Sequence, residues 1–171
     1  MRGRKGQSGF TLLELAVVIV VVSILAGVGL ERLRFYQEAA EAAAVDNGIS
    51  TLKTALHIRS AELISANRWE DLRRLPQRNP FDLLEERPGN YGGAWQGTAA
   101  PAGQWYFDDA ARQIVYRVAR SERFSAEDGG KDIRFVVVGR NTSGQETDRS
   151  GVAYVSLRPV GTYRWFDRML R

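Results

Sequence analysis

The sequence predicts an α+β fold in which a long N-terminal α-helix packs against an antiparallel β-sheet of about four or five strands. An apolar run at residues 10–30 passes without a proline into a helical pattern that continues to residue 66. From Gln104 onward, apolar and polar residues alternate instead, which is the period of a half-buried strand. A helix with one apolar stripe and a sheet with one apolar face bury those surfaces by packing together.

The apolar run is long enough to cross a membrane. Residues 10–30 would form roughly 32 Å of helix at about 1.5 Å per residue, against a hydrocarbon core of about 30 Å. Glu14 is the only charged residue in the run. Because an acidic group is costly inside a bilayer, Glu14 indicates a function that supplies its carboxylate with a partner. The long helix is therefore predicted to be transmembrane in its N-terminal half.

The basic character of the chain is concentrated ahead of the apolar run. The 171 residues carry a net charge of +4, and the isoelectric point is near 9.7. The chain has 24 basic and 20 acidic residues, and Arg2, Arg4 and Lys5 are three of the basic ones. Without these three residues, the rest of the chain is nearly neutral. A basic flank of this kind keeps the N-terminus on the cytoplasmic side of a membrane.

Two simpler kinds of N-terminal segment fit less well. A secretory signal peptide has an apolar region of about 7–15 residues followed by a small-residue cleavage site. The run here is longer, and Ala26 and Gly27 offer only a weak cleavage site within it. An uncleaved signal anchor explains the length and the basic flank, but it gives Glu14 no role.

The junction between the leader and the apolar run carries a family resemblance. After a short basic leader and before the apolar segment stands GFTLLEL, at residues 9–15. This junction resembles the type IV prepilin class, which includes the pseudopilins of type II secretion. The resemblance implies cleavage after Gly9 by a membrane prepilin peptidase and N-methylation of the new first residue, Phe10. It also implies that Glu14 is an assembly contact within a fibre.

Simple electrostatics gives this arrangement a physical basis. Cleavage creates a cationic amine on Phe10, and Glu14 lies one helical turn away, near the positive end of the helix dipole. When two subunits dock in a fibre, the Glu14 carboxylate of one can meet the Phe10 amine of the other. In a low-dielectric site such a pair depends strongly on distance, so it selects the axial register more than it adds stability.

The whole chain is predicted to divide into five segments. They are a leader (1–9), a transmembrane and assembly helix (10–30), an amphipathic half of the same helix (31–66), a short helix with a loop (67–103), and a sheet head with a basic tail (104–171). The amphipathic half has one apolar stripe, formed by Val45, Ile49, Leu52, Leu56 and Leu63. Its other face is predicted to carry Glu38, Glu41, Asp46, Lys53, Arg59 and Glu62. Gly48 marks either a close approach to the sheet or a local bend.

Turn residues and strand patterns divide the C-terminal part of the chain. Asn67 is predicted to cap a short helix that ends at Pro76, and a loop rich in Pro, Gly and Asn follows over residues 77–103. Strands are predicted at 105–107, 114–118, 133–138, 152–157 and 160–166, with the first hairpin turn at 108–111. The order of an Asn79-Pro80 loop before a hairpin that begins WYFD is similar to pilin-like and pseudopilin heads.

The sequence contains no recognisable catalytic set, and an enzyme is not predicted. It lacks a Gly-rich phosphate loop and has no cysteine, which excludes a disulfide framework and a cysteine nucleophile. Its single histidine, His57, has no partner at catalytic or metal-binding spacing and is predicted to lie at the surface. Asp108 and Asp109 resemble a catalytic carboxylate pair, but they fall where a turn is expected.

Two acidic loops have the composition of calcium sites, and major pseudopilins bind calcium near their C-terminal end. The first occupies residues 127–132, and the second contains Asn141, Glu146 and Asp148. Their spacing differs from that of an EF-hand, and Lys131 adds a competing positive charge to the first. Both segments are therefore predicted to be solvated hairpin loops, and the chain is predicted to bind no metal or other cofactor.

The C-terminal tail interleaves basic and aromatic residues. They are Arg158, Tyr163, Arg164, Trp165, Phe166, Arg168 and Arg171. Such a surface can bind DNA through phosphate contacts and base stacking, as some minor pilins do. An edge strand whose charges discourage further strand pairing has the same pattern, followed by a frayed end. The edge strand is the preferred interpretation, and nucleic acid is not the expected partner.

The predicted function is that of a structural subunit of a type IV pilus or a type II secretion pseudopilus. The varied head and the absence of cysteine favour a minor subunit. The chain is expected to cross the inner membrane once, with its head in the periplasm, before it enters a cell-envelope or surface fibre. Its expected partners are other pilin-like subunits, the prepilin peptidase and the inner-membrane assembly platform. The alternative is a pilin-like binding module whose head or tail contacts DNA or a secreted substrate.

Overall fold

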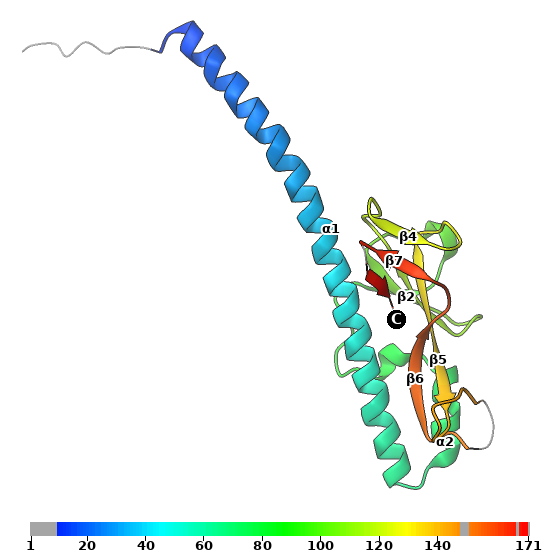
Figure 1. Cartoon of the computed structure of the whole chain (residues 1–171). Helices are drawn as coiled ribbons and strands as arrows, with labels where there is room; N and C mark the ends of the chain where they lie inside the picture. The colour runs from blue at the N-terminus through cyan, green and yellow to red at the C-terminus, as the bar shows by residue number, and fades with distance from the viewer. Residues whose placement is uncertain (1–9, 148–150, 167, 171) are drawn as a thin grey trace, which may run out of the picture. The chain divides into compact units, whose positions relative to one another are not determined.

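The structure, a computed structural model, describes residues 10–147, 151–166 and 168–170 (Figure 1). Within these ranges the helices are α1 (Leu12–Ser65) and α2 (Trp69–Arg74), with 3-10 turns η1 (Leu75–Gln77), η2 (Pro80–Leu83) and η3 (Gly97–Ala99). The strands are β1 (Tyr91–Ala94), β2 (Gln104–Asp108), β3 (Gln113–Arg117), β4 (Phe124–Ala126), β5 (Asp132–Arg140), β6 (Tyr154–Pro159), β7 (Tyr163–Trp165) and β8 (Arg168–Leu170). The chain forms two compact units, one ending at Gln37 and one beginning at Glu38, and α1 contributes to both. The second unit is the head.

The α+β class and the long N-terminal helix are confirmed. α1 is 54 residues long. It ends in a Schellman motif: Asn67 has a φ of 55°, its N–H donates to the Ile64 carbonyl at 3.0 Å, and the Arg68 N–H donates to the Leu63 carbonyl at 2.8 Å. The prediction that Asn67 caps the start of α2 is wrong, because α2 begins at Trp69. Asparagine favours both positions, since it caps helix starts and also tolerates the left-handed backbone that ends a helix.

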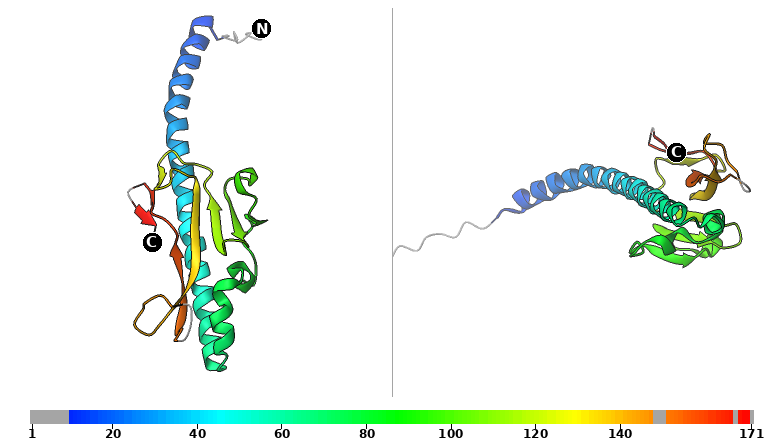
Figure 2. Two further views of the ribbon diagram at one scale, coloured as in Figure 1. Left: turned by 90° about the vertical axis from the view of Figure 1, so that its right-hand side faces the viewer. Right: turned by 90° about the horizontal axis from the view of Figure 1, so that it is seen from below.

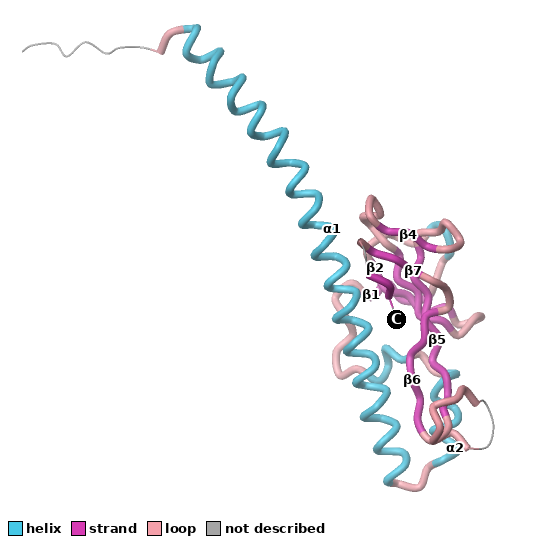
Figure 3. The backbone as a smooth tube through the Cα atoms, in the orientation of Figure 1, coloured by secondary structure: helices cyan, strands magenta, loops and turns pink. Residues whose placement is uncertain are grey.

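The main sheet of the head has five strands in the order β1-β2-β3-β5-β6. Figure 3 draws the strands of the head in magenta. The strands β2, β3, β5 and β6 pair antiparallel, as predicted. The sheet is mixed rather than wholly antiparallel, because β1 pairs with β2 in parallel at one edge. β1 lies inside the segment predicted as a loop. Its sequence, YGGA, has two glycines and no apolar alternation that would mark a strand.

A second sheet has the order β4-β7-β8 among the described residues. The sequence placed residues 160–166 in the main sheet, whereas β7 pairs antiparallel with β4, and Trp165 lies opposite Phe124. Residues 160–162, which include Gly161, separate β6 from β7, so the chain leaves the main sheet there. β4 was not predicted, because three residues are too short a segment to show a period.

The main core lies between the C-terminal half of α1 and one face of the main sheet (Figure 2). The predicted stripe is buried, with Val45, Ile49, Leu52, Leu56 and Leu63 each at most 5% exposed. β5 buries every second residue, as a strand with one face against a core should. The sheet contributes Trp105, Phe107, Ile114, Tyr116, Ile133, Phe135, Val137, Val155 and Leu157 to this core.

Gly48 allows the sheet to approach α1 closely, which confirms one of the two predicted roles for this residue. A Cβ atom at Gly48 would lie 3.0 Å from Cζ2 of Trp105. The ring of Phe81 also packs near Trp105, with 6.1 Å between the centroids. Asn79 positions Phe81, because its Oδ1 accepts a hydrogen bond from the Phe81 N–H at 3.1 Å.

A smaller cluster covers the opposite face of the main sheet. Tyr106 and Val115 form it together with Ala100, and Trp95 packs against it. β1 lies close to this cluster because Gly92 has no side chain. A Cβ atom at Gly92 would lie 2.3 Å from Cε1 of Tyr106, a distance that no packed side chain tolerates.

We expect Gly92→Ala to lower the free energy of unfolding of the head by about 2 kcal/mol, because the added methyl group overpacks a buried ring. Tyr106 is 2% exposed and its hydroxyl donates to the Pro101 carbonyl at 2.8 Å, so its ring cannot simply swing away. Urea denaturation of residues 31–171, followed by tryptophan fluorescence, measures the change. Gly89→Ala is the matched control, since nothing lies within 4 Å of a Cβ atom there. Equal stability of the two variants would contradict the close approach.

Candidate functional site

The start of α1 is capped by a side chain. Thr11 precedes the helix, and its Oγ1 accepts a hydrogen bond from the Glu14 N–H at 3.2 Å. The Thr11 carbonyl accepts the first helical bond, from the Leu15 N–H at 3.1 Å. This is the threonine half of a capping box, T-x-x-E, a sequence signal that marks the helix start.

The cap determines where the predicted processing and assembly residues lie. Glu14 is in the first turn of α1, where the helix dipole favours a negative charge. Phe10 precedes the cap by one residue and is 74% exposed. Gly9, the predicted cleavage residue, lies with the rest of the leader outside the described residues. Cleavage after Gly9, methylation of Phe10 and an assembly contact at Glu14 therefore stay predictions.

The apolar run is not covered by its own chain. Between residues 10 and 30, the large apolar side chains are 46% to 87% exposed. In the described part of the chain, α1 is the one helix whose length and composition suit a membrane span. A continuous apolar surface of this size marks contact with lipid or with another chain.

Glu38 is a buried carboxylate on α1, where the sequence predicted an exposed one. It is 1% exposed. Its Oε1 accepts hydrogen bonds from the Arg123 N–H at 2.7 Å and from Trp165 Nε1 at 3.2 Å. Its Oε2 accepts from Arg123 Nη1 at 3.1 Å. One carboxylate thus joins α1 to the segment before β4 and to β7.

Glu41 is the second buried carboxylate, one turn further along α1, and it too was predicted to be exposed. Its Oε1 accepts from the Tyr116 hydroxyl at 3.0 Å and from the Ala119 N–H at 2.7 Å. Its Oε2 accepts from the Arg120 N–H at 3.0 Å. Burial first, and then the charge of Glu41, raise the pKa of Tyr116 well above its usual range, so the hydroxyl stays a donor.

Glu38 and Glu41, with these donors, form a carboxylate clasp between α1 and the chain that links β3 to β4. Both residues continue the buried stripe in steps of three and four residues to Val45. Residue spacing therefore placed them on the core side of the helix, and residue type led to the wrong prediction. A buried carboxylate is stable only where donors surround it, and those donors come from distant parts of the chain.

The C-terminal tail differs from both of its predicted interpretations. Tyr163 and Trp165 are 3% and 2% exposed, so they belong to the core and offer no stacking surface. β7 is the middle strand of the second sheet rather than an edge strand. Arg158 is engaged by Glu146, whose Oε1 lies 2.8 Å from its Nε. The side chain of Arg168 and the whole of Arg171 lie outside what the structure describes.

The turns that could have carried chemistry are held by their own hydrogen bonds. Asp108 Oδ1 accepts from the Ala110 and Ala111 N–H groups, which confirms the predicted turn. In the first acidic loop, Asp128 Oδ1 accepts from the Gly130 N–H at 2.9 Å. Asp148 of the second acidic loop lies outside the described residues. His57 is exposed, as predicted.

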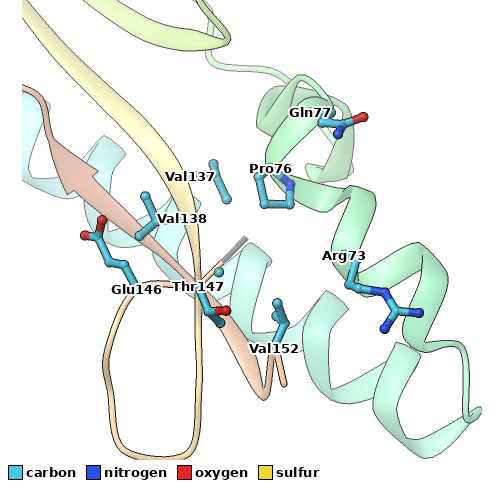
Figure 4. A pocket seen from close by; sticks show the side chains of 9 residues that line it. Arg73, Pro76, Gln77, Val137, Val138, Glu146, Thr147 and Val152 are labelled. Atoms are coloured by element: carbon cyan, nitrogen blue, oxygen red, sulfur yellow. The ribbon is translucent and has the colours of Figure 1, made fainter. Parts of the chain in front are cut away.

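The head also contains a pocket of about 380 Å³ beside η1 and β5 (Figure 4). Its charged residues are engaged by neighbours, since Arg73 pairs with Glu70 and Glu146 with Arg158. The other labelled residues that line it include Pro76 and aliphatic side chains. Within the described residues, no three His, Cys, Asp or Glu side chains lie close enough to hold a metal ion.

Comparison with known proteins identifies the N-terminal segment. Residues 4–30 match the family model of the prokaryotic N-terminal methylation motif. This motif is the signature of prepilin-type cleavage in type IV pilins and pseudopilins, so the resemblance predicted from GFTLLEL is confirmed. Proteins with this motif are structural rather than catalytic. No curated protein and no solved structure matches the chain.

We expect Glu38→Ala to lower the free energy of unfolding by about 3 kcal/mol, because the Trp165 and Arg123 N–H groups lose their acceptor in a largely buried site. Urea denaturation of residues 31–171 measures the loss. Glu62→Ala is the matched control on the same helix, because Glu62 is exposed and pairs with Arg59 at the surface. Its effect should stay within about 0.5 kcal/mol. A loss for Glu38→Ala no larger than for the control would contradict the clasp.

Proposed function

We propose that this chain is a minor structural subunit of a type IV pilus or a type II secretion pseudopilus. The observation that carries the proposal is the coincidence of two features in one segment. The methylation motif covers residues 4–30, and the same residues from 12 onward form a helix whose apolar side chains its own chain leaves exposed. A processed assembly helix needs both features.

The proposed cycle begins in the inner membrane. The basic leader stays in the cytoplasm, the apolar part of α1 spans the bilayer, and the head lies in the periplasm. A prepilin peptidase cuts after Gly9, and Phe10 becomes the N-methylated first residue. The assembly platform then moves the subunit into a fibre, where helices of other pilin-like subunits replace lipid around α1. Val-rich and Gly-containing faces suit this exchange, because helices in an apolar medium associate through close packing.

Glu14 is the proposed register contact. The Thr11 cap starts the helix so that Glu14 falls in its first turn. The cationic amine of Phe10 in a neighbouring subunit is a complementary partner at the same depth. If one member of such a pair is removed, the other is left as a buried unpaired charge, at a cost of about 3–5 kcal/mol.

The head is carried by the same helix that assembles. α1 is one continuous helix from Leu12 to Ser65, and the carboxylate clasp holds the chain between β3 and β4 to it. A subunit drawn into a fibre by its N-terminal segment therefore takes a folded head with it. This arrangement suits a structural subunit.

The alternative is a binding module whose head or tail contacts DNA or a secreted substrate. The described tail gives the DNA version no support, because Tyr163 and Trp165 are core residues. The structural role is therefore the better-supported function. An enzymatic role finds no support in the motif, whose family is structural rather than catalytic.

The first test of this function is the N-terminus of the mature protein. In cells that contain a prepilin peptidase, intact mass and N-terminal sequencing should show a chain that begins at N-methylated Phe10. Gly9→Leu should block cleavage because the peptidase meets a bulky residue at the cut site, whereas Gly6→Leu within the leader should be processed normally. Mature protein that retains the leader would overturn the proposed processing.

The second test is incorporation into fibres. Glu14→Ala should insert into the membrane as well as the natural chain, yet enter sheared fibres about tenfold less or worse, because the neighbour's amine loses its partner. Val18→Ala, one helical turn away, controls for the loss of side-chain volume and should assemble normally. Immunoblots of membrane and fibre fractions measure both steps. Normal incorporation of Glu14→Ala would remove the proposed register contact.

A further inference from the structure

The segment that directly follows the apolar run is exposed but no longer apolar. Residues 31–36 have the sequence ERLRFY, and all six are exposed. Tyr36 is 63% exposed, and its ring meets that of Phe35 edge to face, with centroids 5.6 Å apart. Arg32, Arg34, Phe35 and Tyr36 together form a basic and aromatic collar around α1.

Two acids lie at ion-pair spacing from Arg34: Glu31, which is exposed and forms no ion pair with it in the described part of the chain, and Glu38, which is bound elsewhere. Arg34 and Glu38 are four residues apart, the spacing of an ion pair along a helix. Glu38 is instead 1% exposed and bound by Arg123 and Trp165 within the head. No ion pair of Arg32 or Arg34 is formed within the described ranges of the chain. The collar therefore retains two cations for a ligand outside the chain.

The collar lies at the depth of lipid headgroups. From Leu12 to Leu30 the apolar run forms about 28 Å of helix, close to the hydrocarbon core of about 30 Å, and headgroups add about 5–8 Å on each side. At about 1.5 Å per residue, Arg32 and Arg34 lie about 3 Å and 6 Å beyond Leu30 along the helix. When the apolar run is centred in the core, both guanidinium groups reach the phosphate layer.

We propose that Arg32 and Arg34 bind the phosphate groups of phospholipids in the leaflet at the C-terminal end of the span. A planar guanidinium donates two parallel hydrogen bonds to a phosphate, which makes arginine well suited to this ligand. Phe35 and Tyr36 add aromatic rings, which prefer the boundary between membrane and water. The inference rests on the membrane-anchored state proposed above and adds a specific ligand to it.

This contact sets the depth at which the subunit waits in the bilayer. The leader holds one end of the span by its positive charge, and that hold ends when the leader is removed. The collar holds the other end before and after cleavage. Entry into a fibre must then separate two guanidinium groups from lipid phosphate, so the collar opposes release until assembly contacts replace it.

The test is a solid-state NMR experiment on the full chain in vesicles of phosphatidylethanolamine and phosphatidylglycerol. Arginine labelled with ¹³C at Cζ reports contact with lipid through dephasing by ³¹P. Three chains are compared: the natural one, Arg32→Gln/Arg34→Gln, and the matched control Arg74→Gln/Arg78→Gln in the head. Flotation of the vesicles and protease protection of the span confirm insertion of each chain. The same labelled protein in a neutral detergent with inorganic phosphate distinguishes lipid from free phosphate.

We expect the collar variant to lose about half of the arginine–phosphate signal, since the leader arginines give the same background in every chain. The control variant should keep the full signal, and inorganic phosphate in detergent should give none from the collar. An inserted collar variant with an unchanged signal would overturn the phosphate contact and leave the proposed fibre function intact. Failure of the natural chain to insert would overturn the membrane-anchored state and the collar together. A signal equally strong with inorganic phosphate would overturn the assignment to lipid.

Discussion

The architecture of this protein depends on two carboxylates buried against the helix that carries them. Glu38 and Glu41 receive backbone N–H groups of the chain between β3 and β4, a tyrosine hydroxyl and an indole N–H. A carboxylate that lacked these donors could not remain buried. The donors in turn would be unpaired without the carboxylates. The second sheet and the long helix are therefore held together by these buried hydrogen bonds as well as by apolar contact.

The same helix needs two different surroundings along its length. Its stripe from Val45 onward is covered by the sheet of its own head, whereas its apolar residues before Glu31 are exposed. Apolar surface of the second kind is stable only in a lipid or protein environment supplied from outside. Arg32 and Arg34 stand between the two regions. Their guanidinium groups suit the narrow layer where hydrocarbon gives way to water, which is why a headgroup ligand follows from their position.

One chemical group on α1 is used in two ways. Glu38 and Glu41 find their donors within the chain, and this fixes the head on the helix. Glu14 lies in the first helical turn with its backbone N–H bonded to Thr11, and its carboxylate is exposed. The cationic N-terminus of a second subunit would form an ion pair with this carboxylate. The contrast separates two carboxylates that complete a fold from one that, in the proposed function, completes an assembly.

The sequence by itself determined the features that rest on short-range order. These are the methylation motif, the length of the apolar run, the buried stripe from Val45 to Leu63, and the alternation in β5. Each repeats within a few residues, so local spacing is enough to reveal it. Tertiary structure alone decided which polar and aromatic residues are buried. Glu41 and its donor Tyr116 are 75 residues apart in the sequence, and Glu38 and its donor Trp165 are 127 residues apart. No local sequence pattern can reveal hydrogen bonds between residues so far apart. β1 likewise exists only because β2 offers an edge that Gly92 can approach, since its own four residues carry no strand signal.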